Sequence, residues 1–150
     1  RLLLCGDINS STTHKQLLLL KSALSDLSHF TLPLTTYFKP HPFCSVNLRE
    51  YSTINMIVVD TSLEEIIPDV DIAFCSSFTS AAVDTYLSSL PVIVYRDCSS
   101  LNLSPLRGWP NVFFVSSSRE FVSSIESISA NSPIDIHPDS YFYQCYQHLC

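Results

Sequence analysis

The chain has 150 residues, of which 46% are hydrophobic and 15% are charged, and its formal net charge is −6. A chain of this length and hydrophobicity buries most of its apolar surface in one globular domain, which excludes intrinsic disorder. Eight Lys and Arg residues are too few for a basic face that binds phosphate backbones, so nucleic acid is not an expected partner. The apolar run Leu17 to Leu20 falls far short of the roughly 20 residues that cross a bilayer, so we predict no membrane-spanning domain.

The cysteines favour a reducing compartment. The sequence has six cysteines, but Cys5 and Cys75 lie within runs that resemble buried strands, and a chain with an ample core does not need a disulfide framework. We therefore expect free thiols and a cytoplasmic location. No two cysteines have CxxC spacing, and the Cys and His residues are scattered, so no metal site is expected.

Short apolar runs, separated by stretches of helical periodicity, predict the architecture. Nearly every position within a run is apolar, which is typical of strands covered on both faces of a parallel sheet. Between most runs, apolar residues recur at helical spacing, as at Leu17, Leu20 and Leu24. The pattern predicts an α/β fold, a Rossmann-like open parallel sheet of about six strands with helices on both faces. The predicted strands are Leu2 to Cys5, Leu34 to Phe38, Ile54 to Val59, Ile72 to Cys75, Val92 to Tyr95 and Val112 to Val115.

Two predicted helices begin with a capping-box pattern, in which a serine precedes a glutamate by three residues. These pairs are Ser62 with Glu65 and Ser117 with Glu120. A third segment, Asp139 to Cys150, has apolar residues at helical spacing and is predicted to form a terminal helix.

The residues that follow each predicted strand are the candidates for chemistry, because ligands of open parallel sheets lie outside the carboxyl ends of the strands. The sequence has only two glycines, which excludes the dinucleotide fingerprint and the P-loop. Hydroxyls and the amides of a helix N-terminus can hold a phosphate without glycines. Ser76 to Ala82 would supply both, and the alternative for this segment is ordinary N-capping.

A histidine between two prolines follows the second predicted strand, in Lys39-Pro40-His41-Pro42. The prolines hold the backbone extended and fix the direction of the imidazole. The same dipeptide at His137-Pro138 follows no predicted strand and is interpreted as a surface loop. His14 and His29 lie on or beside the first predicted helix and are expected to be solvated.

These motifs, taken in order, resemble the nucleotide-binding carboxyl-terminal half of the GT-B glycosyltransferases that use CMP-activated sugars. The group includes bacterial sialyltransferases, polysialyltransferases and Kdo transferases. The sequence is especially similar to bacterial surface-carbohydrate biosynthesis proteins, and the resemblance extends from Leu2 to about Ile128. The residues that carry it are Lys-Pro-His-Pro at Lys39 to Pro42, Thr-Ser-Ala-Ala-Val-Asp at Thr79 to Asp84, and Leu-Asn-Leu-Ser-Pro-Leu-Arg-Gly at Leu101 to Gly108.

The resemblance implies a role for individual residues. His41 would contact the CMP phosphate and support departure of the nucleotide, with Lys39 near the base or phosphate. An imidazole suits this role because it supplies a proton or a positive charge near neutral pH. Glu64 would hold the ribose hydroxyls, with Asp60 and Glu65 as alternatives. The serine motif would bind the phosphate at the start of a helix, where the dipole stabilises an anion. The implied binding residues are Lys39, Pro42, Glu64, Ser76, Ser77, Thr79 and Ser80.

The resemblance also implies the partners. The substrate is a CMP-sugar with a sialic-acid-like or Kdo-like sugar, and no cofactor or metal is expected. In the family, the acceptor site and the catalytic base lie in an amino-terminal half that this sequence does not include, and that half could also hold the enzyme at the inner face of the membrane. We therefore expect residues 1–150 to be one Rossmann-like domain of a longer two-domain enzyme, inactive as a transferase by itself.

Two alternatives remain open. CDP-glycerol and CDP-ribitol polyol-phosphate transferases also carry His-Pro and Ser-Ser motifs on a GT-B scaffold, and they make a phosphodiester instead of a glycoside. The domain could also be a non-catalytic part of a polysaccharide-synthesis complex. Nucleotide binding separates the non-catalytic domain from both transferases.

Overall fold

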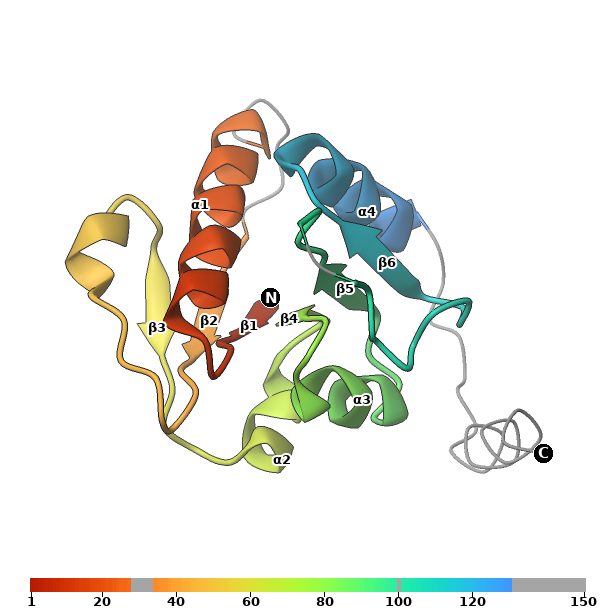
Figure 1. The fold of residues 1–150 in the computed structure, drawn as a ribbon, viewed down its shortest axis with the longest axis horizontal. Coiled ribbons are helices and arrows are strands. Elements are labelled where there is room, and N and C mark those ends of the chain that lie inside the picture. The colour runs from red at the N-terminus through yellow and green to blue at the C-terminus, as the bar shows by residue number, and fades with distance from the viewer. Residues whose placement is uncertain (28–33, 100, 131–150) are drawn as a thin grey trace.

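The computed structural model describes residues 1–27, 34–99 and 101–130, and within them six parallel strands form one open sheet in the order β3-β2-β1-β4-β5-β6 (Figure 1). This confirms the predicted Rossmann-like α/β fold. The strand order is that of doubly wound nucleotide-binding sheets, and it reverses between β1 and β4. The strands are β1 Leu2–Cys5, β2 Thr36–Lys39, β3 Met56–Val58, β4 Ile72–Ser76, β5 Val92–Tyr95 and β6 Val112–Val115.

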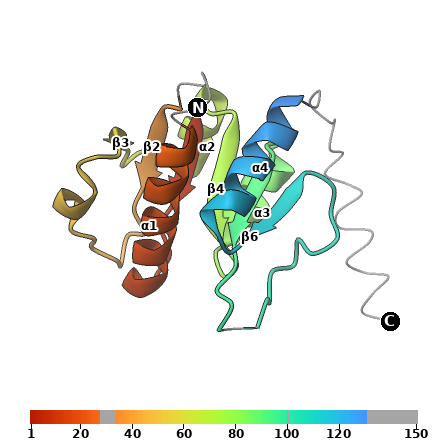
Figure 2. The same cartoon turned by 90° about the horizontal axis from the view of Figure 1, so that it is seen from above.

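Helices cover both faces of the sheet (Figures 1 and 2). Successive residues of β1 contribute to different cores, because side chains of a strand alternate between faces. Leu2 and Leu4 pack with residues of the first and last helices, whereas Leu3 and Cys5 pack with residues of the two middle helices. The helices are α1 Ser10–Leu27, α2 Leu63–Ile66, α3 Ser80–Leu87 and α4 Ser118–Ala130, with short 3-10 helices η1 Leu48–Tyr51 and η2 Ile67–Asp69.

Element boundaries differ from the prediction mainly at β2 and β3. The structure places β2 at Thr36–Lys39 and β3 at Met56–Val58, whereas the apolar runs began earlier and, for β3, also ended later. Lys39 continues the strand because it still pairs with Cys5 of β1. The prediction that each apolar run is covered on both faces is wrong for β3, an edge strand in which Ile57 and Val58 are 46% and 51% exposed. Strand pairing decides where the ladder ends.

The two predicted capping boxes have different outcomes. The first is confirmed: Ser62 Oγ accepts from Glu65 N, and the Glu65 carboxylate accepts from Ser62 N. The second is only half formed, because Ser117 Oγ accepts from Glu120 N at 3.3 Å but the Glu120 carboxylate accepts from Ser116 N at 2.6 Å. The hydrogen bonds from Ser116 lower the pKa of Glu120. The predicted terminal helix at Asp139 to Cys150 lies outside the described residues, and so do His29 and His137.

The cysteines within the described part of the chain are free thiols. Cys5, Cys44 and Cys75 are buried, and Cys98 is exposed. A hydrogen bond with Cys5, together with burial, raises the pKa of Cys75 well above the ordinary thiol value. The predicted burial of Cys5 and Cys75 in strands is confirmed.

Candidate functional site

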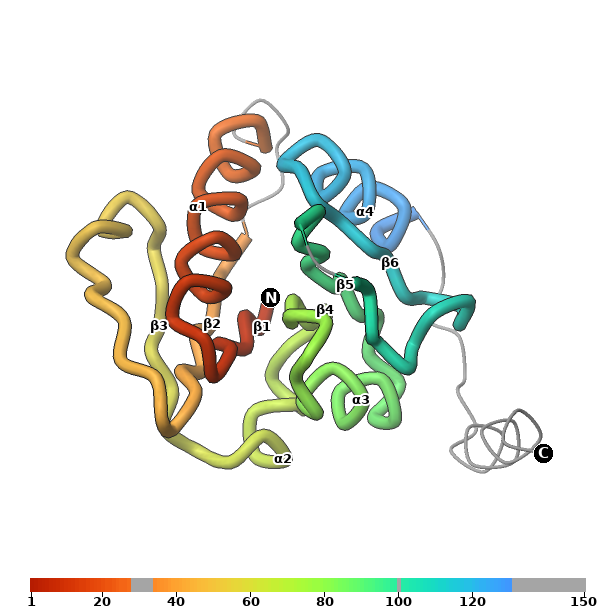
Figure 3. Tube along the Cα trace, in the orientation of Figure 1, coloured from red at the N-terminus to blue at the C-terminus, as the bar shows by residue number. Residues whose placement is uncertain are grey.

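The loops that carry the predicted motifs leave three neighbouring strands at the same edge of the sheet. Cys5 at the end of β1 is level with Lys39 of β2, and Leu4 is level with Phe74 of β4. The chain turns from β1 directly into α1 and from β4 into α3 (Figure 3). The histidine loop, the loop after β1 and the serine loop therefore follow one another along the carboxyl edge, where open parallel sheets bind ligands.

Gly6 holds the histidine loop close to the loop after β1. Its N–H donates to the Lys39 carbonyl at 2.9 Å. A Cβ atom at this position would lie 3.2 Å from the backbone nitrogen of His41 and 3.5 Å from the Lys39 carbonyl oxygen. The contact with the His41 nitrogen is tighter than normal packing, so a side chain at this position would have to displace the histidine loop by a few tenths of an ångström.

A buried carboxylate joins the β1 loop to the serine motif. Asp7 is only 3% exposed, and its Oδ2 accepts a hydrogen bond from the hydroxyl of Ser76. Its Oδ1 accepts from Asn9 N at 2.7 Å, and its own N–H donates to Thr13 Oγ1 at 2.8 Å. Since β1 and β4 flank the point where the strand order reverses, this network fixes both walls of the crevice.

A cavity of about 380 Å³ opens beside this network. Its walls come from the β1 loop, the start of α1, the serine loop and the end of β5. Asp97 on the β5 side pairs with Lys15 Nζ at 2.5 Å, and this partner lowers the pKa of the carboxyl. The cavity is lined by Asp7, Ile8, Asn9, Thr12, Ser77, Phe78, Tyr95 and Asp97.

The hydroxyls of the serine motif have different surroundings: that of Ser76 is engaged in a buried hydrogen bond, whereas the others lie nearer the cavity or the start of α3. Ser76 is 1% exposed and its hydroxyl already donates to Asp7, whereas Ser77 lines the cavity. Thr79 is the N-cap of α3 but makes no side-chain capping bond, since its Oγ1 instead contacts the Ser76 carbonyl at 3.5 Å. Ser80 is exposed at the first position of the helix. The first amides of α3 therefore lack a side-chain cap, and an anion could accept their hydrogen bonds.

The histidine motif lines a different cavity. His41 and Pro42 border a space of about 560 Å³ together with Phe38, Phe43 and Val58 on the β2 and β3 side. His41 Nδ1 accepts a hydrogen bond from Phe43 N at 3.2 Å, which holds the imidazole over its own loop. His41 and Ser77 thus stand at the same edge but do not border the same cavity.

The remaining predicted residues lie farther along this edge. Lys39 Nζ donates to the Thr61 carbonyl. Glu64 is exposed on α2 and borders neither cavity, and the carboxylate of Glu65 is engaged in the capping box. The predicted solvation of His14 is correct, since it is exposed, although its ring also bonds to Tyr51.

Asp7, Asn9 and Asp97 are among the residues that follow predicted strands, but no sequence motif assigned a role to them. Their place directly after β1 and β5 was the available signal, since an acidic residue that follows a buried strand lies at the ligand-binding edge. The bond between Asp7 and Ser76 joins positions 69 residues apart, and no local pattern predicts such a pair.

Comparison of the chain with protein-family models, curated proteins and solved structures finds no match. None of the helices in residues 1–27, 34–99 and 101–130 is both long enough and apolar enough to span a bilayer. Within the same ranges, no three His, Cys, Asp or Glu side chains gather in a way that could hold a metal ion.

Proposed function

We propose that this chain binds a CMP-activated sugar at the carboxyl edge of its sheet, as the donor-binding half of a cytoplasmic glycosyltransferase. One observation carries the proposal: the histidine and serine motifs leave strands on either side of β1, around the point where the strand order reverses. The sequence resemblance requires these two motifs to act on one nucleotide. Their common edge supports that requirement.

The nucleotide phosphate would lie at the start of α3, where the amides lack a side-chain cap and the Ser77, Thr79 and Ser80 hydroxyls are nearby. The cavity beside Asp7 suits a different part of the ligand. Asp7 and Asp97 border it, and Lys15 pairs with Asp97, so the cavity offers carboxylate oxygens that would accept hydrogen bonds from ribose hydroxyls or a cytosine amino group. Each carboxylate oxygen accepts more than one hydrogen bond, so Asp7 can bind a ligand and still hold Ser76.

His41 would act on the phosphate from the β2 side. Its Nδ1 is occupied by the Phe43 amide, which leaves Nε2 to donate to a phosphate oxygen as the bond to the sugar breaks. A charge-assisted hydrogen bond at that point stabilises the departing CMP. The acceptor glycan and the catalytic base would come from a second half, as the resemblance implies.

Isothermal titration calorimetry with CMP, UMP and AMP tests the proposal. We expect CMP to bind more tightly than the other two nucleotides. His41→Ala should weaken CMP binding by about tenfold to a hundredfold, because a charge-assisted hydrogen bond contributes about 1.5 to 3 kcal/mol. Ser77→Ala should weaken it about fivefold, since a neutral hydroxyl contributes about 1 kcal/mol.

Two matched controls accompany these variants: His137→Ala, for the second His-Pro dipeptide, and Ser123→Ala, on the exposed side of α4. Both should bind CMP as the wild type does. Circular dichroism verifies that each variant is folded. If no nucleotide binds, the non-catalytic alternative is correct. If CMP binds, turnover of the full-length enzyme with a CMP-sugar or CDP-glycerol distinguishes the two transferase classes.

A further inference from the structure

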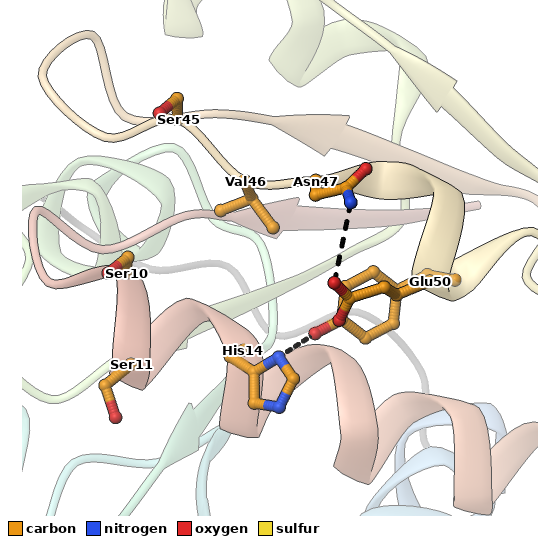
Figure 4. Close-up of a pocket in the computed structure, with 8 residues that line it drawn as sticks. Ser10, Ser11, His14, Ser45, Val46, Asn47 and Glu50 are labelled. Atoms are coloured by element: carbon orange, nitrogen blue, oxygen red, sulfur yellow. Dashed lines mark hydrogen bonds between the residues drawn. The ribbon is translucent and has the colours of Figure 1, made fainter.

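A third cavity, of about 310 Å³, lies between the start of α1 and the 3-10 helix η1 (Figure 4). It shares no lining residue with the cavity beside Asp7. In Figure 4, His14 on α1 and Glu50 on η1 extend toward each other across this space. Its size is at the lower end of the range for small-molecule sites.

His14 is held in one orientation on the α1 side. The Tyr51 hydroxyl bonds to His14 Nδ1, and the two rings meet edge to face with centroids 5.7 Å apart. Tyr51 is 2% exposed, and burial raises the pKa of its hydroxyl, which therefore stays protonated at neutral pH. With Nδ1 occupied, Nε2 is the ring nitrogen left for a ligand.

Glu50 is positioned on the opposite wall. Asn47 caps η1 by accepting from Arg49 N at 3.3 Å, and Asn47 Nδ2 donates to Glu50 Oε1 at 3.5 Å. The side chain of Asn47 therefore links the start of η1 to the carboxylate. The result is a strong acceptor that faces an imidazole across a small cavity.

The lining selects the charge of the ligand. Glu50 is the one charged carboxylate among the residues that border the cavity, and neither Lys nor Arg is among them. A phosphate or carboxylate ligand would meet uncompensated repulsion, whereas a divalent cation needs more oxygen ligands than one carboxylate provides. Serine hydroxyls and the Asn47 amide both donate and accept, and Val46 with the Tyr51 side chain adds an apolar wall.

We propose that this cavity binds a neutral, hydroxyl-rich ring, namely a pyranose unit of a glycan. One sugar hydroxyl would donate to Glu50, and another would accept a hydrogen bond from His14 Nε2. The C–H face of the ring would lie against Val46, which borders the cavity. This proposal rests on the lining of this cavity, which shares Ser45 and Val46 with the cavity that His41 borders.

Saturation-transfer NMR with methyl glucoside, methyl galactoside and N-acetylglucosamine tests this site. We expect at least one of them to bind with a dissociation constant on the order of millimolar, as befits a ligand with few heavy atoms. The anionic sugar N-acetylneuraminic acid should bind at least tenfold more weakly. A neutral-sugar signal that CMP abolishes and that Glu50→Gln leaves unchanged would place the sugar elsewhere and overturn the proposal.

The variant that decides the test is Glu50→Gln, at an exposed position where the fold does not depend on the charge. Loss of a charge-assisted hydrogen bond should weaken sugar binding about tenfold. His14→Gln should have a similar effect, and Glu126→Gln, on the exposed side of α4, should have none. The proposal is wrong if no neutral sugar binds the wild-type protein even at sugar concentrations well above millimolar. It is also wrong if Glu50→Gln and His14→Gln both bind the sugar as tightly as the wild type does.

Discussion

Replacing Asp7 by alanine should destabilise the protein more than any other loss of a single carboxylate in the described chain. Asp7 is 3% exposed and its carboxylate accepts hydrogen bonds from Ser76 Oγ and Asn9 N. Hydrogen bonds to a charged group contribute about 1.5 to 3 kcal/mol each, so the two bonds total about 3 to 6 kcal/mol. Relief of the desolvation of the buried charge offsets part of this loss. We expect the free energy of unfolding to fall by about 3 kcal/mol.

Two further variants separate the hydrogen bonds of Asp7. Asp7→Asn keeps an oxygen for Asn9 N but replaces the acceptor of the Ser76 hydroxyl with an amide, so its cost should be about 1 to 2 kcal/mol. A double-mutant cycle of Asp7→Asn with Ser76→Ala should give a coupling energy above about 1 kcal/mol, because the two side chains are in contact.

Urea unfolding, with the free energy extrapolated to water, is the assay. Asp26→Ala is the matched control, since Asp26 is an exposed aspartate of α1, and it should change the free energy by less than about 0.5 kcal/mol. If Asp7→Ala and Asp26→Ala unfold at the same urea concentration with equal slopes, the carboxylate does not hold the two loops together.

Three other outcomes are expected. Gln16→Met should raise the free energy of unfolding, measured in urea, by about 1 to 2 kcal/mol. The reason is that Gln16 is fully buried and its amide atoms have no hydrogen-bond partner within the described chain. An unchanged or lower free energy of unfolding would contradict this. Asp97→Asn should lower the melting temperature more at pH 6 than at pH 2. The bond from Lys15 depresses the pKa of Asp97 in the folded state, so its contribution is complete above the unfolded value near pH 4 and declines as the pH falls from there toward the lowered folded value. Parallel pH profiles of the variant and the wild type would refute the pair. Iodoacetamide should label Cys98 in the native protein and leave Cys75 unmodified, because Cys98 is exposed whereas Cys75 is buried with a raised pKa; equal labelling rates in peptide mass maps would disprove the burial.

The strands and helices could be predicted because their signals are local. Leu3 and Cys5 face one core and Leu2 and Leu4 the other, so every residue of β1 is buried and the run is continuously apolar. The hydrogen-bond partners of polar side chains, by contrast, depend on three-dimensional geometry. The Glu120 carboxylate could accept a hydrogen bond from either Ser116 or Ser117. The geometry of the turn, which the capping-box pattern does not encode, makes Ser116 the donor.

The same distinction explains the candidate site. The serine pair was predicted as a unit because both residues follow a buried strand, yet alternation along the chain separates them. Ser76, still within β4, is buried and donates to Asp7, whereas Ser77 reaches the cavity. Which serine meets a ligand depends on the position of Asp7, which is fixed by the packing of β1 against β4. Local sequence predicts the edge at which an open parallel sheet binds ligands, and contacts between distant segments decide which side chains at that edge are already engaged.

The absence of a glycine-rich loop gives the Asp7 network its importance. In sheets with a glycine fingerprint, the backbone itself approaches the phosphate at the reversal point of the strand order. Here a side chain occupies that place, because Asp7 bridges β1 and β4 through Ser76, and its charge excludes an anion from the cavity it borders. A phosphate bound at this edge must then lie one step away, over the amides of α3 that lack a side-chain cap. In the proposed complex, Asp7 would direct the uncharged part of the nucleotide inward, so this buried aspartate would set the orientation of the ligand as well as the shape of the crevice.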